Sequence, residues 1–484
     1  MRAAHPAPPA IVPRHPGAVG AWAGRASALV HRGARWGRIG VISALFAPWI
    51  VLAGPTKKIL LAIALLDIPL QIDKNLDYLD DPAQLGALGG FEISLTTVAL
   101  VGLYIAWFIE HASARRDDVP TAPFRLVRPL ALYVLVAAVS AVAAADVGLY
   151  ARGLFLLVQL LLLFIYLVNN IRSRQDVRFV VTMLLCGLLF ESAIIVGLGT
   201  SAESLNVAGF RVFVDTATQD IGGPRFYGTL GSPINAAAYF ELILAPALAV
   251  LATSLGRTHK VLAGLGVVLG LIALVGTLSR AAWGATIVSM IVTCAAFRTG
   301  GERRGGYGLA VPLLLLAVVA GVLLTFQATI ATRVTGDDYG SARGRLPLAA
   351  TALEIITDSP ILGIGVNNYT AALPRYEANF TGEWLYTVHN KYLLVWAEAG
   401  IGGLAAFLWF LAATVRRGRE VWKRRDPLLS PLALGLTAGL VGQMGHMVVD
   451  IYSSRSEVEF LWVVAALIAA MSRMTTEPAA LEAR

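Results

Sequence analysis

The chain has 484 residues, of which 57% are hydrophobic and only 14% are charged. This composition excludes a soluble globular protein and predicts a polytopic membrane protein. The formal net charge of +8 does not indicate nucleic-acid binding, because much of it falls in short connections between apolar runs, where positive charge marks the cytoplasmic side. Both cysteines, Cys186 and Cys294, lie inside apolar runs and are interpreted as packing residues rather than a disulfide.

The N-terminal region begins with residues 1–38, which are rich in Ala, Pro, Gly and Arg and predict a disordered basic cytoplasmic tail. The next apolar stretch, Ile39–Gly54, is either an interfacial helix or an additional span, since no convincing cleavage site makes it a signal peptide. Lys57 and Lys58 are better placed inside, so Ile59–Ile72 becomes a short first span. Twelve spans and thirteen spans both remain open.

The rest of the chain contains long apolar runs near the roughly 20 residues that a membrane-spanning helix needs. These candidate spans are Phe91–Ile109, Pro129–Ala145, Leu154–Val168, Phe179–Gly199, Ala236–Thr253, Val261–Gly276, Ala281–Phe297, Leu309–Phe326, Tyr392–Val415, Leu432–Asp450 and Phe460–Met471. The predicted fold is therefore an all-α polytopic membrane protein with about 12 transmembrane helices. Its predicted parts after the tail are an N-terminal bundle (39–325), an outer cap loop (326–390), C-terminal helices (391–473) and a cytoplasmic tail (474–484).

Charge alternation between the connections predicts the orientation of the chain. Basic connections such as 170–178 and 416–425 alternate with short or acidic ones such as 73–90. The positive-inside rule then puts the loop 200–232 and the cap 326–390 outside, and the C-terminus in the cytoplasm.

Three arginines on the predicted outer side suggest anion binding. Arg211 and Arg225 belong to the loop 200–232, whose glycines and prolines predict tight turns rather than a regular element, and Arg280 lies between two spans. Arginine forks match phosphate oxygens bidentately. The alternatives are that Arg211 and Arg225 anchor the loop at the membrane surface and that Arg280 only snorkels to it.

The predicted cap is far longer than an ordinary connection, and loops of that length are usually functional or disordered. It keeps aromatic and aliphatic residues, so we expect it to fold. It contains the turn Asp358-Ser359-Pro360, the glycines Gly363 and Gly365, and His389 near its end. Its acidic pair Asp337–Asp338 has no well-spaced third carboxylate, so a metal site is not predicted.

Several polar residues fall inside the apolar runs, where charges are costly and usually functional. They are Asp67, Glu191, Glu241, Glu398, Gln443, His446 and Asp450. A proton- or ion-coupled transporter would pair such groups near mid-membrane, with Glu241 and Glu398 as the best candidates. We favour a structural role, with carboxylates satisfying arginines or helix ends, because no inverted repeat of the transporter kind is visible.

Four stretches, taken together and in order, resemble the O-antigen ligase and Wzy-type polymerase superfamily of bacterial envelope enzymes. They are Arg211…Arg225-Phe-Tyr-Gly-Thr-Leu-Gly-Ser-Pro-Ile-Asn235, Thr277-Leu-Ser-Arg-Ala-Ala-Trp-Gly284, Ser341…Arg345 with Asp358-Ser-Pro-Ile-Leu-Gly-Ile-Gly-Val-Asn-Asn-Tyr369, and Val388-His-Asn-Lys-Tyr392…Glu398-Ala-Gly-Ile-Gly-Gly403. The resemblance implies a GT-C-like helix bundle under a periplasmic or extracellular cap, in the bacterial inner membrane. It also implies inverting transfer of a glycan from undecaprenyl diphosphate to an acceptor hydroxyl, without a metal or cofactor.

The resemblance assigns roles to particular residues. Arg211 and Arg225 match the family's diphosphate-binding arginines, Arg280 and Arg345 match further arginines, and His389 matches the proposed base. Supporting roles fall to Glu398, Asn390 and Tyr392. The residue chemistry agrees, because guanidinium groups stabilise a departing diphosphate and an imidazole with a pKa near 6.5 suits a base at neutral pH. The alternative is that His389 merely precedes the next helix, with Asn390 as its cap.

The family includes activities that differ in the acceptor. A polysaccharide polymerase joins lipid-linked repeat units, an O-antigen ligase transfers the glycan to lipid A–core, and an oligosaccharyltransferase transfers it to protein. The Gly-Thr-Leu-Gly-Ser-Pro run and the long N-terminal extension favour the polymerase. Expected partners are the lipid-linked donor, a glycan or lipid-linked acceptor, a flippase and a chain-length regulator. The alternative from another class is a polysaccharide flippase or transporter, which needs no base.

Overall fold

The computed structural model describes residues 54–113, 124–198, 205–207, 210–212, 225–299, 316–317, 319–335, 341–379 and 386–482. The predicted tail 1–38, most of the ambiguous stretch Ile39–Gly54, the acidic pair Asp337–Asp338 and the first half of the span Leu309–Phe326 lie outside these residues.

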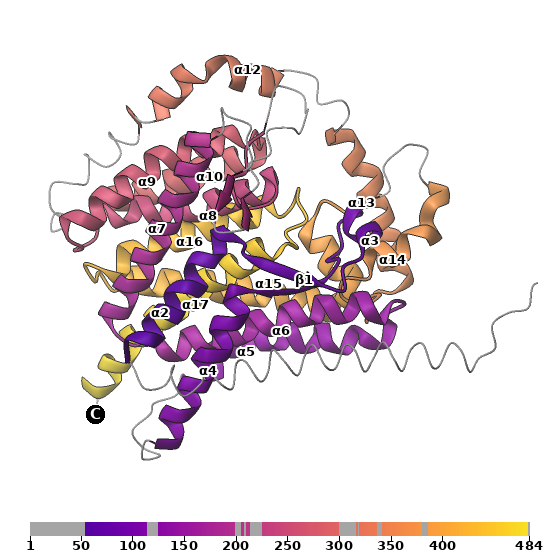
Figure 1. Cartoon of the computed structure of the whole chain (residues 1–484), viewed down its shortest axis with the longest axis horizontal. Helices are drawn as coiled ribbons and strands as arrows, with labels where there is room; N and C mark the ends of the chain where they lie inside the picture. Colours follow the sequence, from indigo (N-terminus) through magenta and orange to yellow (C-terminus); the bar gives the residue numbers. More distant parts are fainter. Residues whose placement is uncertain are drawn as a thin grey trace, which may run out of the picture.

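The described residues form a helical bundle with two small sheets (Figure 1). The longer helices are α2 (Gly54–Leu70), α4 (Leu95–Ser113), α5 (Phe124–Val139), α6 (Val147–Asn170), α7 (Arg174–Leu198), α8 (Pro233–Val250), α9 (Arg257–Gly276), α10 (Arg280–Thr299), α13 (Ser341–Asp358), α15 (Lys391–Lys423), α16 (Leu429–His446) and α17 (Arg455–Glu482). The shorter elements are α3 (Asp80–Gln84), η1 (Ser140–Ala143), α12 (Gln327–Thr335), α14 (Tyr369–Ala372), η2 (Leu373–Asn379) and the strands β1 (Asp73–Leu76), β2 (Phe91–Ser94), β3 (Leu205–Val207) and β4 (Phe210–Val212).

Within the described ranges, seven helices are long and apolar enough to cross a membrane. They are α5 continued through η1, α6, α7, α8, α9, α15 and the first 21 residues of α17. The two central helices, α8 and α17, are 89% buried in their apolar windows. A helix that is apolar on all sides belongs inside such a bundle. The predicted class, a helical polytopic membrane protein, is confirmed.

The structure corrects the prediction at two places. The span predicted from Phe91 starts at Leu95, because Phe91–Ser94 forms β2, which pairs antiparallel with β1. The loop 200–232 was expected to hold only turns, yet β4 pairs with β3 and sets Arg211 opposite Asn206. Beyond the predicted span Phe460–Met471, α17 continues to Glu482.

Close packing of α16 against α8 and α10 shows how these helices run relative to one another. A Cβ on Gly439 of α16 would lie 2.7 Å from the carbonyl oxygen of Leu242, and one on Gly442 would lie 2.9 Å from that of Ala285. Such small residues let helix backbones approach closely in a membrane bundle. Gly435 packs in the same way against Ala245, so α8 and α16 run antiparallel. The start of α8 and the end of α16 therefore lie at one end of the bundle, which we call the site end.

The opposite end of the bundle is basic. Arg417, near the end of α15, donates to the backbone carbonyls of Arg125 and Leu126 at the start of α5, at 2.7 and 3.2 Å. Arg174, at the start of α7, pairs with Asp426. We call this the basic end.

Candidate functional site

The start of α15 positions His389 at the site end. Asn390 caps the helix, because its side chain accepts hydrogen bonds from the amides of Tyr392 and Leu393, both at 3.0 Å. Two further bonds tie this turn to the end of α16: the Lys391 amide donates to the Met447 carbonyl at 2.8 Å, and the Tyr392 hydroxyl donates to the Met444 carbonyl at 2.7 Å. The predicted supporting residues Asn390 and Tyr392 thus hold the segment that carries His389.

His389 is half-buried and has a free ring nitrogen. Its ring stacks on that of Tyr386, with 5.3 Å between centroids and 33° between planes. Among the described residues, its buried Nδ1 has no hydrogen-bond partner. Burial lowers the pKa of His389 below its usual 6.5; the carboxylate of Asp450 opposes this shift, and the guanidinium of Arg345 adds to it. The imidazole is therefore neutral at pH 7, as a general base must be.

Arg225 is bonded to the junction between α9 and α10, and Arg280 follows this junction. The Arg225 Nε donates to the carbonyl of Thr277 at 2.8 Å, and the amide of Phe226 donates to the carbonyl of Gly276 at 2.9 Å. Arg280 begins α10 three residues after Thr277. Both arginines are thus attached to the same connection between two helices. Arg211 lies in β4, and its side chain is outside the described residues.

The last turns of α16 lie between these arginines and His389. Gly442 packs on Ala285 of α10, and from that contact both α16 toward Met447 and α10 back toward Arg280 run to the site end. The other side of the α16 terminus holds the His389 turn through Met447. Arg345, in α13, is an electrostatic neighbour of His389. The structure thus brings Arg225, Arg280, Arg345 and His389 to the same end of the bundle.

The intramembrane carboxylates have identifiable partners. Glu241 of α8 lies 2.6 Å from His446 Nδ1, Tyr452 lies 2.7 Å from the same nitrogen, and His446 Nε2 lies 3.6 Å from Asp450. This chain of buried groups runs from α8 to Asp450 beside His389. Oε2 of Glu241 is therefore paired with a histidine and a tyrosine rather than with an arginine, while its buried Oε1 has no hydrogen-bond partner among the described residues.

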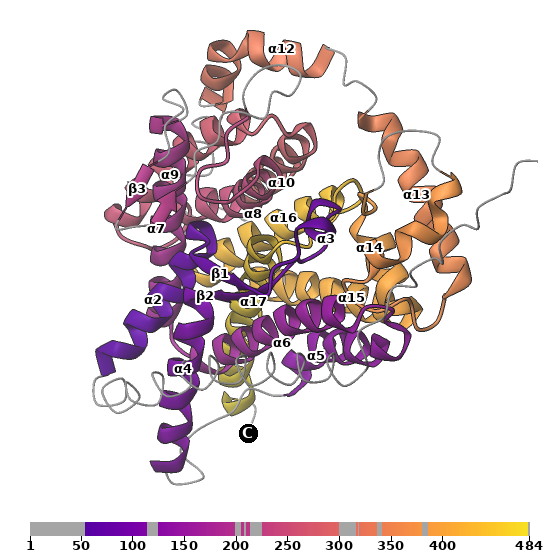
Figure 2. The same ribbon diagram turned by 45° about the vertical axis from the view of Figure 1, so that its right-hand side comes forward.

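A buried arginine that the sequence analysis missed organises the neighbouring hairpin. Arg455, only 2% exposed, lies 3.0 Å from Asp67, 3.1 Å from Asp73 and 3.1 Å from Glu459. Glu92 of β2, at 4.0 Å, has its pKa raised to about 7 by burial. These contacts hold the β1–β2 hairpin across the start of α17 (Figure 2). Asp67 was flagged as a buried carboxylate, but no motif in the sequence indicated its partner.

The glycine motif that follows Pro360 docks into a break in α15. Gly400 interrupts the helix with φ 67°, and the freed backbone groups bind the motif: the Ile401 amide donates to the Pro360 carbonyl, and the Gly365 amide to the Glu398 carbonyl, both at 2.9 Å. Gly363 and Gly365 also have positive φ, which glycine adopts without a Cβ penalty. This docking aligns Glu398 with Tyr369, whose amide donates to the Glu398 carboxylate at 3.4 Å.

The two asparagines of the same motif attach it to the rest of the site end. The Asn367 side chain accepts from the Leu88 amide at 2.7 Å and donates to the carbonyls of Leu88 and Leu149, at 3.0 and 2.9 Å. Asn368 pairs in the same two-way manner with the backbone of Asp146. The motif is thus a structural clamp between α6, α15 and the turn before β2.

Replacing Gly400 with alanine is expected to lower the free energy of unfolding by about 2 kcal/mol or more, because the left-handed backbone costs a residue with a Cβ about 1–2 kcal/mol and that Cβ would overlap the Ile361 carbonyl. The apparent melting temperature in detergent measures this. Gly402→Ala is the control, since its Cβ would have an ordinary 3.5 Å contact with Val136 and alanine favours helix. Equal melting temperatures for the two variants would contradict the docking.

A large apolar cavity opens beside Arg280. It has a volume of about 570 Å³ and is lined by α9, α10 and the segment 316–330. Trp283, one turn after Arg280, is part of its wall and donates to the Leu274 carbonyl at 2.9 Å. The cavity can accept a hydrocarbon chain whose polar head would lie at the two arginines.

These features define a polytopic membrane protein whose site gathers arginines and one histidine at a bundle end. Comparison with protein families gives the class a name: residues 265–408 match the model of the O-antigen ligase family. The recognised resemblance to the superfamily of O-antigen ligases and polymerases is confirmed over these residues. The matched residues include Arg280, Arg345, the docked glycine motif and His389. A search of curated proteins found no match.

Proposed function

We propose that this protein is a metal-independent inverting glycosyltransferase that moves a glycan from undecaprenyl diphosphate to an acceptor hydroxyl. The observation that carries the proposal is the arrangement of Arg225, Arg280 and His389 around the end of α16. In this reaction the acceptor oxygen attacks the anomeric carbon of the donor glycan. The bond between that carbon and the diphosphate oxygen breaks, and the diphosphate leaves as an anion.

Each part of the site has a task in that reaction. His389 takes the proton of the acceptor hydroxyl, for which its lowered pKa keeps it neutral. Arg225 and Arg280, with Arg211, neutralise the departing diphosphate, because guanidinium groups form bidentate charge-assisted hydrogen bonds with phosphate oxygens. The apolar cavity beside Arg280 is suited to the polyprenyl chain.

The charge distribution supports an orientation for this reaction. The basic end carries arginines at the starts of α7 and α9 and at the end of α15, and positive charge favours the cytoplasmic side. The site end then faces the periplasm or the exterior of a bacterial inner membrane. There it would receive lipid-linked glycans from a flippase, and a chain-length regulator would act on its product.

Among the activities of the family we favour a polysaccharide polymerase, on the Gly-Thr-Leu-Gly-Ser-Pro run. In the structure this run is attached to α7 and to the end of α2, because the Thr229 amide donates to Glu191 Oε1 at 2.9 Å and the Thr229 hydroxyl donates to the Pro69 carbonyl at 2.6 Å. The alternatives are an O-antigen ligase acting on lipid A–core and a protein oligosaccharyltransferase.

Incubating the purified protein with lipid-linked repeat units alone separates these activities. A polymerase is expected to build a ladder of longer lipid-linked glycans, because donor and acceptor are the same species. A ligase or an oligosaccharyltransferase leaves the donor unchanged until lipid A–core or an acceptor protein is added. Gel electrophoresis of the glycans reads the outcome, and an unchanged donor with all three acceptors would contradict the glycosyltransferase.

A further inference from the structure

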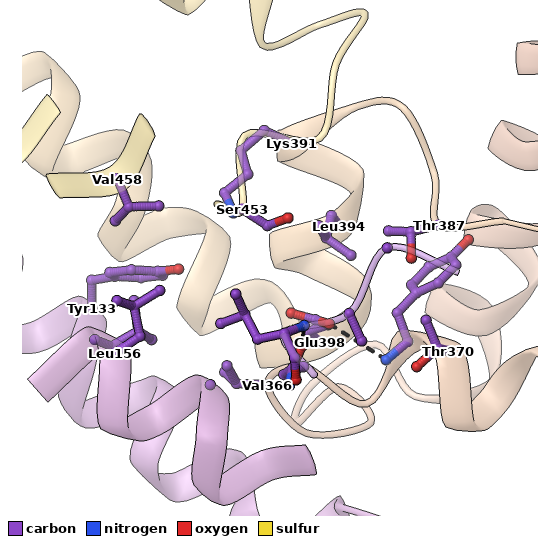
Figure 3. A pocket seen from close by; sticks show the side chains of 17 residues that line it. Tyr133, Leu156, Val366, Thr370, Thr387, Lys391, Leu394, Glu398, Ser453 and Val458 are labelled. Atoms are coloured by element: carbon purple, nitrogen blue, oxygen red, sulfur yellow. Dashed lines mark hydrogen bonds between the residues drawn. The ribbon is translucent and has the colours of Figure 1, made fainter. Parts of the chain in front are cut away.

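A second cavity lies beside the start of α15, next to the turn that carries His389. It is lined by the turn 86–88, by α6, by the segment 366–370 and by the first two turns of α15 (Figure 3). Thr387 and Lys391, two residues before and two after His389, both belong to its wall. Its volume is about 50 Å³, whereas one water needs about 10–15 Å³. The cavity therefore admits a group of several heavy atoms.

Two buried hydroxyl groups in its wall have no hydrogen-bond partner among the described residues: those of Tyr369 and Thr370. The two side chains are 1% and 5% exposed. Leaving a buried polar group unpaired costs about 1–3 kcal/mol, so such groups are retained where a ligand or water satisfies them. Both groups come from the clamp motif, which fixes their backbone through Asn367 and Asn368.

Opposite charges complete the lining. Lys391 and Glu398 both contribute to the wall, and Figure 3 shows them around the same space. Within the described part of the chain, no ion pair of 4.0 Å or less and no side-chain hydrogen bond engages the Lys391 ammonium. The cavity thus offers an ammonium donor, a carboxylate acceptor and two hydroxyl groups, beside the apolar surfaces of Leu156 and Leu394.

We infer that this cavity is a subsite for a hydroxyl-bearing arm of the acceptor sugar, held by Tyr369, Thr370, Lys391 and Glu398. A sugar presents hydroxyl groups that both donate and accept and C–H faces that pack on apolar side chains. A hydrocarbon chain would leave every polar group of the cavity unpaired. The inference rests on the proposed function, since the ligand beside a base is the molecule whose hydroxyl loses its proton, and the donor's arginines lie across the end of α16.

The test uses variants that remove only the unpaired oxygens, Tyr369→Phe combined with Thr370→Val, in the full-length protein. Because neither hydroxyl has a partner to lose, the double variant is expected to keep its melting temperature. The probe is the repeat-unit oligosaccharide of the producing cells with a short alkyl aglycone, which carries no diphosphate. Thr414→Val is the control, because its hydroxyl is bonded to the Phe410 carbonyl inside α15.

The expected result is about tenfold weaker equilibrium binding of the oligosaccharide to the double variant, from two lost hydrogen bonds, with undecaprenyl-diphosphate binding unchanged. In transfer assays the KM for the oligosaccharide rises by the same factor, and kcat at saturating acceptor is retained. Equal oligosaccharide affinity for the wild type and the double variant would show a cavity that holds only water, and would overturn the subsite. A wild type that binds the oligosaccharide through these residues but transfers no glycan to it supports the subsite while refuting the proposed function.

Discussion

Replacing His389 with alanine is expected to slow glycan transfer by about 10²–10⁴-fold, the usual contribution of a positioned general base. A sugar hydroxyl is a poor nucleophile at neutral pH, and alanine offers no group to accept its proton. The fold should persist, because the cap of α15 is supplied by Asn390 and not by His389. Initial rates of transfer from lipid-linked donor by the purified protein measure the effect.

The matched control for this variant is His259→Ala. His259 lies at the start of α9, at the basic end, and its ring contacts Thr182 at 3.0 Å. The control should transfer glycan at the wild-type rate. Wild-type activity in the His389 variant would show that His389 is not the general base. It would favour a transporter, because a transporter needs no base.

The pH dependence of transfer follows from the lowered pKa of His389. The base is active when neutral, so the rate should be at its plateau at pH 7 and fall as the pH drops through this pKa, below 6.5. Asp450→Asn removes the carboxylate that favours the imidazolium. In that variant the acid limb of the pH–rate profile should therefore move to lower pH.

Replacing Arg280 with alanine is expected to weaken the binding of undecaprenyl diphosphate by about 10- to 100-fold, because a hydrogen bond to a charged group contributes about 1.5–3 kcal/mol. Arg280→Lys should recover part of the loss, since an ammonium keeps the charge but lacks the bidentate fork. Arg225→Lys should behave alike, with a further cost because it also gives up the bond from Nε to Thr277.

Equilibrium binding to the purified variants measures this effect. Arg257→Ala removes the same charge from the start of α9 at the basic end and should bind the lipid as the wild type does. Unchanged affinity in all the site-end variants would remove these arginines from the donor site.

Hydropathy predicted the helices well because the membrane imposes one simple rule: about 20 apolar residues per span with all backbone groups bonded internally. The rule says nothing about short elements at the membrane surface. The strand Phe91–Ser94 is apolar enough to extend the predicted span, yet Asp73 to Leu76 pairs with it. Long-range pairing of this kind leaves no periodic signal in a four-residue strand.

The candidate site residues could be named from the sequence, whereas the residues that support them could not. Arg280 stood out because a charge at an apolar run is costly, Arg225 because it lies beside a glycine-rich turn on the predicted outer side, and His389 because of the family resemblance. The clamp made by Asn367 and the break at Gly400 join positions far apart in the sequence, such as Asn367 and Leu88, and such pairings follow only from the folded chain. Three of the four partners of Arg455, namely Asp67, Asp73 and Glu92, were missed for the same reason.

The most direct measurement of the central claim combines donor binding and glycan transfer in one preparation of the His389→Ala protein. If arginines hold the diphosphate while His389 only accepts a proton, this protein should retain the undecaprenyl-diphosphate-linked glycan with wild-type affinity and pass almost none of it to the acceptor. Transfer at the wild-type rate, or loss of donor binding without loss of fold, would contradict this division of roles.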